Sequence, residues 1–346
     1  MPNTKSSLHY VYDTQPGYSR VRRGKSFSFL NQKGKPIKSQ STIKRLQSLA
    51  VPPAYHDTWY CPDPNGHIQA VGIDARGRKQ YRYHPDWIAE RDNQKYDRMI
   101  AFAKALPLIR KHTQKDLKLK GLPRAKVLAT VVQLLEKTLI RIGNDEYAKT
   151  NQSFGLTTLK NSHVDIHGPK IHFKFKGKSH VVHDIEIEDE RLAKIVKQCQ
   201  ALPGYEIFEY EDEMGKRHDV KSNDINEYIK SICQQDFTAK DFRTWAGTLL
   251  AAKALREYKS FTSKTEAKRQ ILEAIESVSV KLGNTKAVCR KCYIHPQILD
   301  AHIDGTLSKL FESRASKLLK GDLKSFTKDE AVVLVLLEKS LKTDSK

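Results

Sequence analysis

The chain has 346 residues, which indicates two domains or one large one, because a domain usually holds about 100 to 200 residues. Lysine and arginine number 61 against 40 acidic residues, so the formal net charge is +21, an excess typical of a protein that binds a polyanion. The longest clean apolar run, residues 331–337, is far shorter than the roughly 20 residues that a membrane span needs, which excludes a membrane-spanning protein.

The start of the chain and its cysteines indicate the compartment. Residues 1–10 show no apolar segment behind a basic start, so we expect no secretory signal and a cytoplasmic, nucleoid-associated protein. The five cysteines are too few and too scattered for a disulfide framework, which agrees with a reducing compartment.

The N-terminal part of the chain is basic and rich in turns. The first fifty residues contain one acid, Asp13, and a block of basic residues: Lys5, Arg20, Arg22, Arg23, Lys25, Lys33, Lys35, Lys38, Lys44 and Arg45. From Pro52 to about Trp87, prolines and glycines separate short stretches of β-forming residues. We therefore predict an α+β fold, with a small antiparallel β-rich domain over residues 1–92 and a larger, mainly helical domain with a small three-stranded sheet over residues 93–346.

The next segments alternate between helical and strand periodicity. Apolar residues recur every three or four positions from Leu128 to Ile142, which predicts a buried helix with Arg141 near its end. Between Val164 and Ile187 the pattern changes to strict alternation: Ile171, Phe173 and Phe175 share one face, and a hairpin tip follows at Gly177 and Lys178.

Helices are predicted again in the last third of the chain. Thr238 and Asp241 form a start like a capping box, and Phe242, Trp245, Leu249 and Ala252 mark one face of the helix that follows. Another face consists of Ile271, Leu272, Ile275, Val278 and Leu282, closed by Gly283. Thr327 and Glu330 begin a last helix over residues 331–341, and residues 342–346 are expected to fray.

Two motifs suggest binding chemistry, and each has a simpler alternative. Residues 76–84, RGRKQYRYH, interleave cations, an amide and aromatic rings, which suits nucleic acid; the alternative is an amphipathic strand with Tyr81 and Tyr83 packed on the core. Cys289, Cys292 and His295 have metal-like spacing, but a structural zinc site needs four ligands, so we expect no metal. The sequence contains no H-E-x-x-H, Walker loop or G-x-G-x-x-G motif, so we expect no cofactor.

Five segments in order resemble the poxvirus-like and bacterial type IB DNA topoisomerases over nearly the whole chain. They are AVGIDARGRKQYRYHP (70–85), LIRIGNDEYAKTNQSFGLTTLKNSHV (139–164), FKFKGKSH (173–180), AKDFRTWAGT (239–248) and KLGNTKAVCRKCYIHP (281–296). The resemblance implies that a monomer closes as a clamp on double-stranded DNA. It also implies relaxation of positive and negative supercoils through a 3′-phosphotyrosine intermediate, without ATP or metal.

The resemblance also implies roles for single residues. Tyr293 would be the nucleophile, Arg141 and Arg243 would stabilise the transition state, and Lys178 would be the general acid. Asn284 would donate to a phosphate oxygen, where the better-known family pattern has histidine. DNA contacts would come from Arg78, Lys79, Gln80, Tyr81, Tyr83 and Tyr147. Lys174 and Lys176 lie on the same predicted hairpin as Lys178, so the general-acid role depends on the G-K match.

The chemistry of this set can be argued without the family. A phosphodiester under in-line attack gathers negative charge on its non-bridging oxygens, which two arginines and an amide can stabilise. The departing 5′ oxygen needs a proton, which a lysine can supply. The covalent intermediate preserves the energy of the broken bond, so religation needs no nucleotide.

Two other functions remain possible from the residues alone. A tyrosine recombinase uses the same Arg, Lys, Arg and Tyr chemistry, but its pattern has histidine three residues before the second arginine, where this chain has Lys240. A non-catalytic DNA-binding or architectural protein would explain the charge, but not the order of Arg141, Lys178, Arg243 and Tyr293.

Overall fold

The computed structural model describes residues 8–24, 26–75, 77–258, 261–313 and 323–344. The chain divides into two compact units, Met1–Asp97 and Arg98–Lys346, and the division falls inside a long helix, α2 (Pro85–Asp116). The domain boundary at residues 92 and 93 stays a prediction. Within the described residues, no helix is long and apolar enough to cross a membrane.

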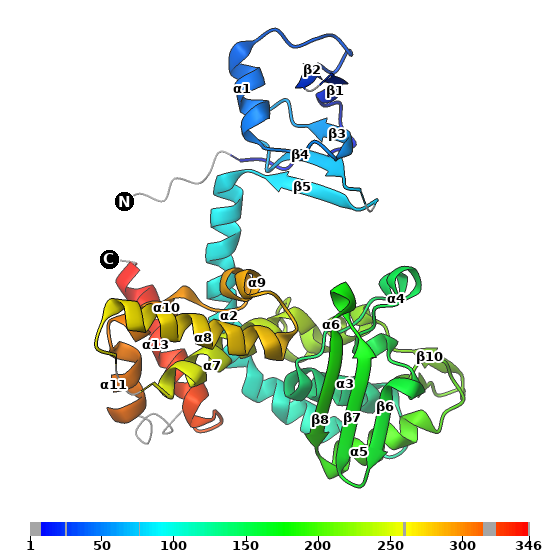
Figure 1. Cartoon of the computed structure of the whole chain (residues 1–346). Coiled ribbons are helices and arrows are strands. Elements are labelled where there is room, and N and C mark those ends of the chain that lie inside the picture. The colour runs from blue at the N-terminus through cyan, green and yellow to red at the C-terminus, as the bar shows by residue number, and fades with distance from the viewer. Residues whose placement is uncertain (1–7, 25, 76, 259–260, 314–322, 345–346) are drawn as a thin grey trace. The chain divides into compact units, whose positions relative to one another are not determined.

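Antiparallel strands form most of the regular structure described in the first unit (Figure 1). One hairpin and one three-stranded sheet, in the order β3-β4-β5, are built from β1 (Ser19–Arg23), β2 (Ser26–Leu30), β3 (His56–Tyr60), β4 (Ile68–Ile73) and β5 (Lys79–Tyr83). The sequence analysis did not predict the short helix α1 (Gln40–Ser48), whose N-terminus is capped by the Ser39 hydroxyl.

Two residues of the basic N-terminal block hold the first unit together. The Arg20 guanidinium donates to the carbonyl oxygens of Val51, Pro52 and Tyr55, and its carbon lies 4.2 Å from the centre of the Phe27 ring. Arg45 donates to Gln69 Oε1 and to two loop carbonyls. These two cations therefore stabilise loops as well as contributing charge; Lys5 and Lys25 lie outside the described residues.

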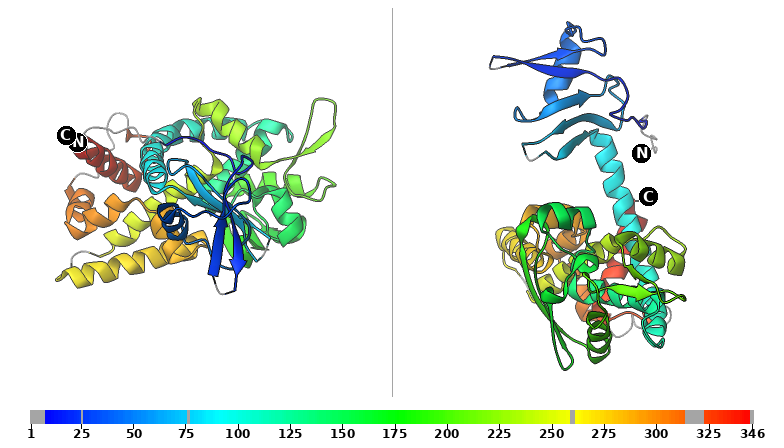
Figure 2. Two further views of the ribbon diagram at one scale, coloured as in Figure 1. Left: turned by 90° about the horizontal axis from the view of Figure 1, so that it is seen from above. Right: turned by 90° about the vertical axis from the view of Figure 1, so that its right-hand side faces the viewer.

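The second unit combines a small sheet with helices, as predicted for the α+β class. Figures 1 and 2 show the sheet, in the order β6-β7-β8, on one side of this unit and α10, α11 and α13 on the other. The strands and the helices before α7 are α3 (Arg124–Thr138), α4 (Asp145–Asn151), β6 (Val164–His167), β7 (Lys170–Lys176), β8 (Val182–Glu188), α5 (Glu190–Gln200), β9 (Glu209–Glu211), β10 (Arg217–Asp219) and α6 (Ser222–Cys233). The later helices are α7 (Ala239–Arg256), α8 (Lys264–Leu282), α9 (Lys286–Cys292), α10 (Pro296–Ile303), α11 (Thr306–Ser313) and α13 (Lys328–Asp344).

Several predicted features are confirmed in the second unit. Ile171, Phe173 and Phe175 are buried on one face of β7, and Gly283 ends α8 with φ +56°. The backbone N–H of Thr238 donates to Asp241 Oδ2 at 2.7 Å, which closes the predicted capping box of α7.

Other details differ from the prediction. The helix α3 ends at Thr138, so Arg141 lies beyond it and not within its last turn. Leu272 is 55% exposed and does not belong to the buried face of α8. The last helix begins at Lys328 and continues to Asp344, so residues 342–344 are helical.

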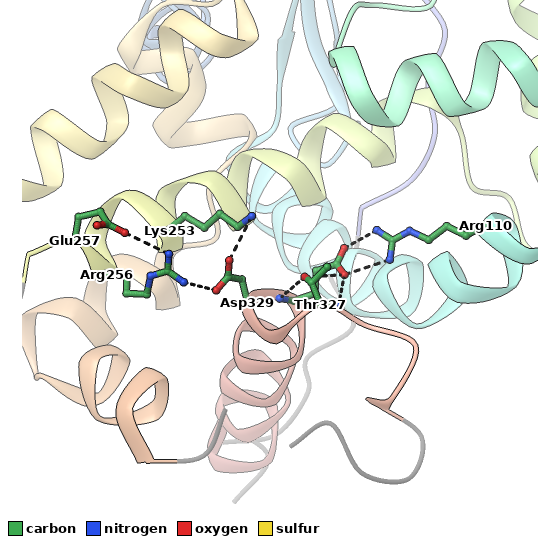
Figure 3. A network of polar contacts seen from close by, with 7 residues as sticks. Arg110, Lys253, Arg256, Glu257, Thr327 and Asp329 are labelled. Carbon is green, nitrogen blue, oxygen red and sulfur yellow. Dashed lines mark hydrogen bonds and ion pairs between the residues drawn. The ribbon is translucent and has the colours of Figure 1, made fainter. Parts of the chain in front are cut away.

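A polar network fixes the start of α13 (Figure 3). Arg110 of α2 donates to both carboxylate oxygens of Glu330, which also accepts from the backbone N–H of Thr327. Figure 3 shows Lys253 and Arg256 of α7 turned toward Asp329 on the other side of the helix start. These contacts join α2, α7 and α13, so the last helix is anchored to the unit that carries the site described below.

Candidate active site

Arg141 follows a sharp turn at the end of α3. Leu139 adopts a left-handed conformation with φ +57°, which ends the helix and directs the following residues away from its axis. Backbone hydrogen bonds then fix the segment, because Leu156 N donates to Arg141 O at 2.9 Å and Thr157 N donates to Ile142 O at 2.7 Å. The extended segment, and not the helix, therefore positions Arg141.

The Arg141 side chain reaches the end of α8. Its Nη2 donates to Asn284 Oδ1 at 2.5 Å and to Gly283 O at 3.2 Å. Its Nη1 is buried and makes no hydrogen bond within the described part of the chain. The structure thus brings Arg141 and Asn284 together, with one guanidinium nitrogen still able to donate.

Arg243 is held more deeply, in the first turns of α7. Its side chain belongs to a residue only 4% exposed, and it donates to the backbone oxygens of Leu139 and Leu282. The guanidinium carbon lies 5.4 Å from the centre of the Tyr293 ring, and Nε is a buried donor that makes no hydrogen bond among the described residues. Arg243 therefore joins the ends of α3 and α8 beneath the tyrosine.

The two arginines form a concentrated positive site. Burial lowers the pKa of both guanidinium groups, and the charge of Arg243 lowers that of Arg141 further. Arginine still remains protonated at neutral pH. Within the described residues neither forms an ion pair with a carboxylate, so an anion bound between them would relieve both desolvation and mutual repulsion.

The backbone of Tyr293 is held by its neighbours, and its side chain accepts a hydrogen bond from the Arg243 guanidinium. It caps the C-terminus of α9, and its carbonyl accepts a hydrogen bond from Thr248 Oγ1 at 3.1 Å. A Cβ atom at Gly247 would lie 2.7 Å from Tyr293 O and 2.9 Å from Tyr293 Cβ, so only glycine allows this approach. Gly247 and Thr248 lie within the motif at residues 239–248, but no role was predicted for either.

Lys178 lies in the loop between β7 and β8. It is exposed, and its Nζ is 6.0 Å from the centre of the Tyr147 ring of α4. Tyr147 is 38% exposed, so it is not a packed core aromatic. Lys174, by contrast, pairs with Asp184 at 3.6 Å.

These side chains meet around one cavity of about 460 Å³. Its lining consists of Arg141, Ile142, Gly143, Asn144, Tyr147, Ser153, Phe154, Lys178, Ala239, Lys240, Arg243 and Tyr293. Asn284 is behind Arg141 and does not belong to this lining. A larger hollow of about 980 Å³ shares Phe154 with it and is lined in part by Lys149, Lys160, Lys174 and Lys176. The cavity thus contains four of the five predicted catalytic residues.

The predicted DNA contacts of the N-terminal unit lie on and next to β5. Asp74 Oδ2 accepts from Gln80 Nε2 at 3.0 Å and pairs with Arg78, and Lys79 pairs with Asp13. The rings of Tyr81 and Tyr83 stack with 5.9 Å between their centres; Tyr81 is 41% exposed, whereas Tyr83 packs against a buried cluster. Residue 76 lies outside the described residues. The packing of Tyr83 agrees with the amphipathic-strand alternative, and the DNA contacts of this stretch stay a prediction.

Cys289 and His295, near Tyr293, make contacts that stabilise the fold. Cys289 is fully buried, burial raises the pKa of its thiol, and its carbonyl accepts from Tyr293 N. His295 caps α10, with Nδ1 accepting from Gln297 N. Among the described residues, no group of three or more His, Cys, Asp or Glu side chains is arranged to hold a metal ion.

Comparison with known proteins gives concordant matches. Residues 79–318 match the family described as the catalytic core of eukaryotic DNA topoisomerase I, and residues 26–74 match the N-terminal domain of bacterial DNA topoisomerase IB. DNA topoisomerase 1B of Acanthamoeba polyphaga mimivirus is 31% identical over 293 residues, covering 83% of this chain and 87% of that protein. DNA topoisomerase 1B of vaccinia virus (strain Copenhagen) is 26% identical over 249 residues, covering 71% and 75%.

The matches show a DNA topoisomerase of the type I class. More closely, the chain belongs to the type IB DNA topoisomerase family, as its sequence motifs predict. These matches support the topoisomerase prediction and neither of the two other functions, the recombinase and the non-catalytic DNA-binding protein.

Proposed function

We propose that the cavity around Tyr293 is the centre where this topoisomerase cleaves and rejoins one strand of duplex DNA. The observation that carries the proposal is a pair of buried, unpartnered guanidinium nitrogens, Arg141 Nη1 and Arg243 Nε, on residues that line a cavity with Tyr293. Within the described residues, neither nitrogen makes a hydrogen bond. Buried donors of this kind are nearly always satisfied in proteins, and a phosphodiester supplies the acceptor oxygens that they lack.

The arginines stabilise the charge that develops during attack. Tyr293 Oη forms a bond to phosphorus while the bond to the 5′ oxygen breaks, and negative charge gathers on the non-bridging oxygens. Two fixed cations in a buried site act strongly on that charge, because their positions are set before the reaction by the carbonyls of Leu139, Leu282 and Gly283. Arg141 and Arg243 therefore serve as transition-state stabilisers.

Lys178 supplies the proton to the departing 5′ oxygen. It lines the cavity together with Tyr293, whereas Lys174 and Lys176 line the neighbouring hollow. No described carboxylate pairs with Lys178, so its ammonium group can move to the leaving oxygen. In cleavage Tyr293 attacks as the phenolate, its proton having passed to water, and Lys178 protonates the 5′ oxygen. In religation the 5′ hydroxyl returns this proton to Lys178 and attacks phosphorus, and Tyr293 leaves as the phenolate, so atoms and charge balance in both directions.

Asn284 acts through Arg141 and through its own amide. Its oxygen accepts from Arg141, and Nδ2 makes only a 3.4 Å contact with Leu282 O. Although Asn284 does not line the cavity, this amide nitrogen is the donor that it offers to a phosphate oxygen bound at Arg141. It carries no charge, so its contribution is smaller than that of a guanidinium.

The remaining features concern how DNA is held. Tyr147, and in the N-terminal unit Arg78, Lys79, Gln80, Tyr81 and Tyr83, contact the duplex, and the basic lining of the larger hollow attracts its backbone. The protein works as a monomer that closes as a clamp on DNA. It is a bacterial enzyme of the cytoplasm, associated with the nucleoid, in agreement with the match of residues 26–74 to a bacterial domain.

Plasmid relaxation tests the proposed nucleophile. The protein is mixed with supercoiled plasmid of either sign in EDTA without ATP, and we expect relaxation through a covalent 3′ adduct. The Tyr293→Phe variant should bind duplex DNA as tightly as the unaltered protein but form no adduct and relax nothing. Full relaxation by this variant would sink the assignment of Tyr293.

A further inference from the structure

A buried histidine lies directly behind the loop that carries Lys178. His183 is the second residue of β8 and pairs in register with Phe175 of β7. Its imidazole stacks on the Phe175 ring with 5.0 Å between the ring centres and 16° between the planes. Only 8% of the residue is exposed, so the ring belongs to the interior and none of the roles above uses it.

The edge of this imidazole contacts two glycines from distant parts of the chain. A Cβ atom at Gly177 would lie 2.6 Å from His183 Cδ2 and 2.7 Å from Nε2. A Cβ atom at Gly283 would lie 2.8 Å from His183 Cε1. The ring is therefore in close contact with the backbone before Lys178 on one side and with the backbone before Asn284 on the other.

Each of these glycines belongs to a different part of the reaction centre. Gly177 N donates to Val181 O at 2.8 Å and closes the short loop in which Lys178 lies. Gly283 O accepts from Arg141, and the preceding Leu282 O accepts from Arg243. The imidazole thus packs between the loop of Lys178 and the backbone of Leu282 and Gly283, which holds the two arginines.

The surroundings of His183 keep its imidazole uncharged. Burial, together with the charges of Arg141 and Arg243, lowers the pKa of His183 to about 4. The ring therefore carries no charge at neutral pH and adds no repulsion to the two arginines. This side chain can fill the space between the loops without disturbing the positive site.

We propose that His183 is a positioning residue that keeps the Lys178 loop in register with the Gly283–Asn284 turn. The proton donor is thereby held at a fixed place relative to the phosphate bound by the arginines. The inference rests on the proposed role of Lys178 as general acid. Lys178 has no ion pair of its own among the described residues, and Ser179 and His180 have left-handed backbone conformations, so the loop depends on contacts of this kind.

A double-mutant cycle tests the contact itself. Gly177 has φ −94°, which alanine adopts without strain, so the imidazole is what opposes a methyl group there. We expect His183→Ala and Gly177→Ala each to slow single-turnover cleavage of a labelled duplex by roughly tenfold to a hundredfold, the range for small misplacements of reacting groups. In the His183→Ala background the alanine at Gly177 should slow cleavage by less than about threefold, because its clash is gone. Additive losses would overturn the proposed contact.

A substrate with a better leaving group tests the route through Lys178. A duplex with sulfur in place of the bridging 5′ oxygen releases a thiolate, which leaves without a proton. Cleavage of this duplex by Lys178→Ala, His183→Ala and Gly177→Ala should return to within a few-fold of the unaltered protein. Arg243→Ala should stay slow, because charge still develops on the non-bridging oxygens.

The outcomes distinguish the positioning role of His183 from the general-acid role of Lys178 on which it rests. If the sulfur substrate restores cleavage by Lys178→Ala but not by His183→Ala, the positioning role of His183 is overturned and Lys178 remains the general acid. If the sulfur substrate does not restore cleavage by Lys178→Ala, the general-acid role of Lys178 is overturned, and the positioning role of His183 with it. Duplex affinity and the melting temperature are measured for each variant. Gly177→Ala, which removes no core side chain, reports on the same contact if His183→Ala does not fold.

Discussion

At the scale of single residues, the two arginines that we propose as catalytic differ in what holds them. Arg243 is almost completely buried and contacts backbone carbonyls at the ends of two helices. Arg141 is partly exposed and is held by Gly283 O and by the amide oxygen of Asn284. Removing Arg243 therefore deletes both a charge and a structural tie, whereas removing Asn284 deletes an uncharged donor and loosens Arg141.

This difference predicts unequal losses. Asn284→Ala should slow single-turnover cleavage by about tenfold, and Arg243→Ala by roughly a hundredfold to a thousandfold, as for the loss of a donor to a developing oxyanion. Asn284→His, which keeps a donor at the same place, should remain within a few-fold of the unaltered protein. Equal or larger losses for Asn284→Ala would show that the amide contributes more than a neutral donor.

At the scale of elements, local patterns predicted the strands and caps that depend on neighbouring residues. The alternation from Ile171 to Phe175 and the capping box of Thr238 and Asp241 both need only a few consecutive side chains. The end of α3 was predicted wrongly, because the apolar pattern continues to Ile142 while Leu139 takes a left-handed conformation. That turn is stabilised from outside the segment, since Leu139 O accepts from Arg243.

The candidate site shows still more clearly that local sequence patterns do not predict contacts between distant segments. Arg141 and Asn284 are 143 positions apart and hydrogen-bonded, and no periodicity within either segment indicates their contact. Only the resemblance to the topoisomerase family assigned Arg141 and Asn284 to the same reaction. Gly247, Thr248 and His183 were missed because they touch the backbone of catalytic segments, and such contacts leave no signal in one sequence. A glycine within a helix, four residues after an arginine as Gly247 is after Arg243, is at most a weak indication of close packing.

The anchoring of α13 yields a prediction on stability. Burial opposes ionisation of Glu330, but the hydrogen bonds from Arg110 and Thr327 N hold the pKa of its carboxyl below the ordinary value. Glu330→Gln should lower the free energy of unfolding by about 2 to 4 kcal/mol at pH 7, because Arg110 then loses its more buried partner and keeps only Glu136. A lowered carboxyl pKa stabilises the folded state above the unfolded value and is lost as pH falls, so the difference should shrink below about pH 4.

A neighbouring residue provides the control. Asp329 pairs with Lys253 and Arg256, whose side chains are 42% and 38% exposed, so Asp329→Asn should lower the free energy by less than about 1 kcal/mol. Urea unfolding of both variants between pH 3.5 and 7 makes the comparison. A larger loss for Asp329→Asn than for Glu330→Gln would contradict the ranking.

At the scale of the whole molecule, the charge of +21 serves several purposes. Arg20 and Arg45 satisfy loop carbonyls, and Arg141 and Arg243 are committed to the cavity. Other cations are neutralised by acids, as Lys194 is by Glu190. The attraction to DNA at a distance must come from exposed cations without such partners, and Lys176 in the larger hollow is one of them within the described residues.

Salt dependence of binding distinguishes these groups of cations. In a Tyr293→Phe background, which prevents cleavage, the logarithm of the association constant for a duplex should fall linearly and steeply with the logarithm of salt concentration. Lys176→Ala should reduce the slope by about 0.9, the value for one phosphate contact on B-form DNA. Lys194→Ala, with its ammonium already 2.7 Å from Glu190, should leave the slope unchanged. Equal slopes for all three proteins would mean that Lys176 releases no counterion and that the hollow does not face the DNA backbone.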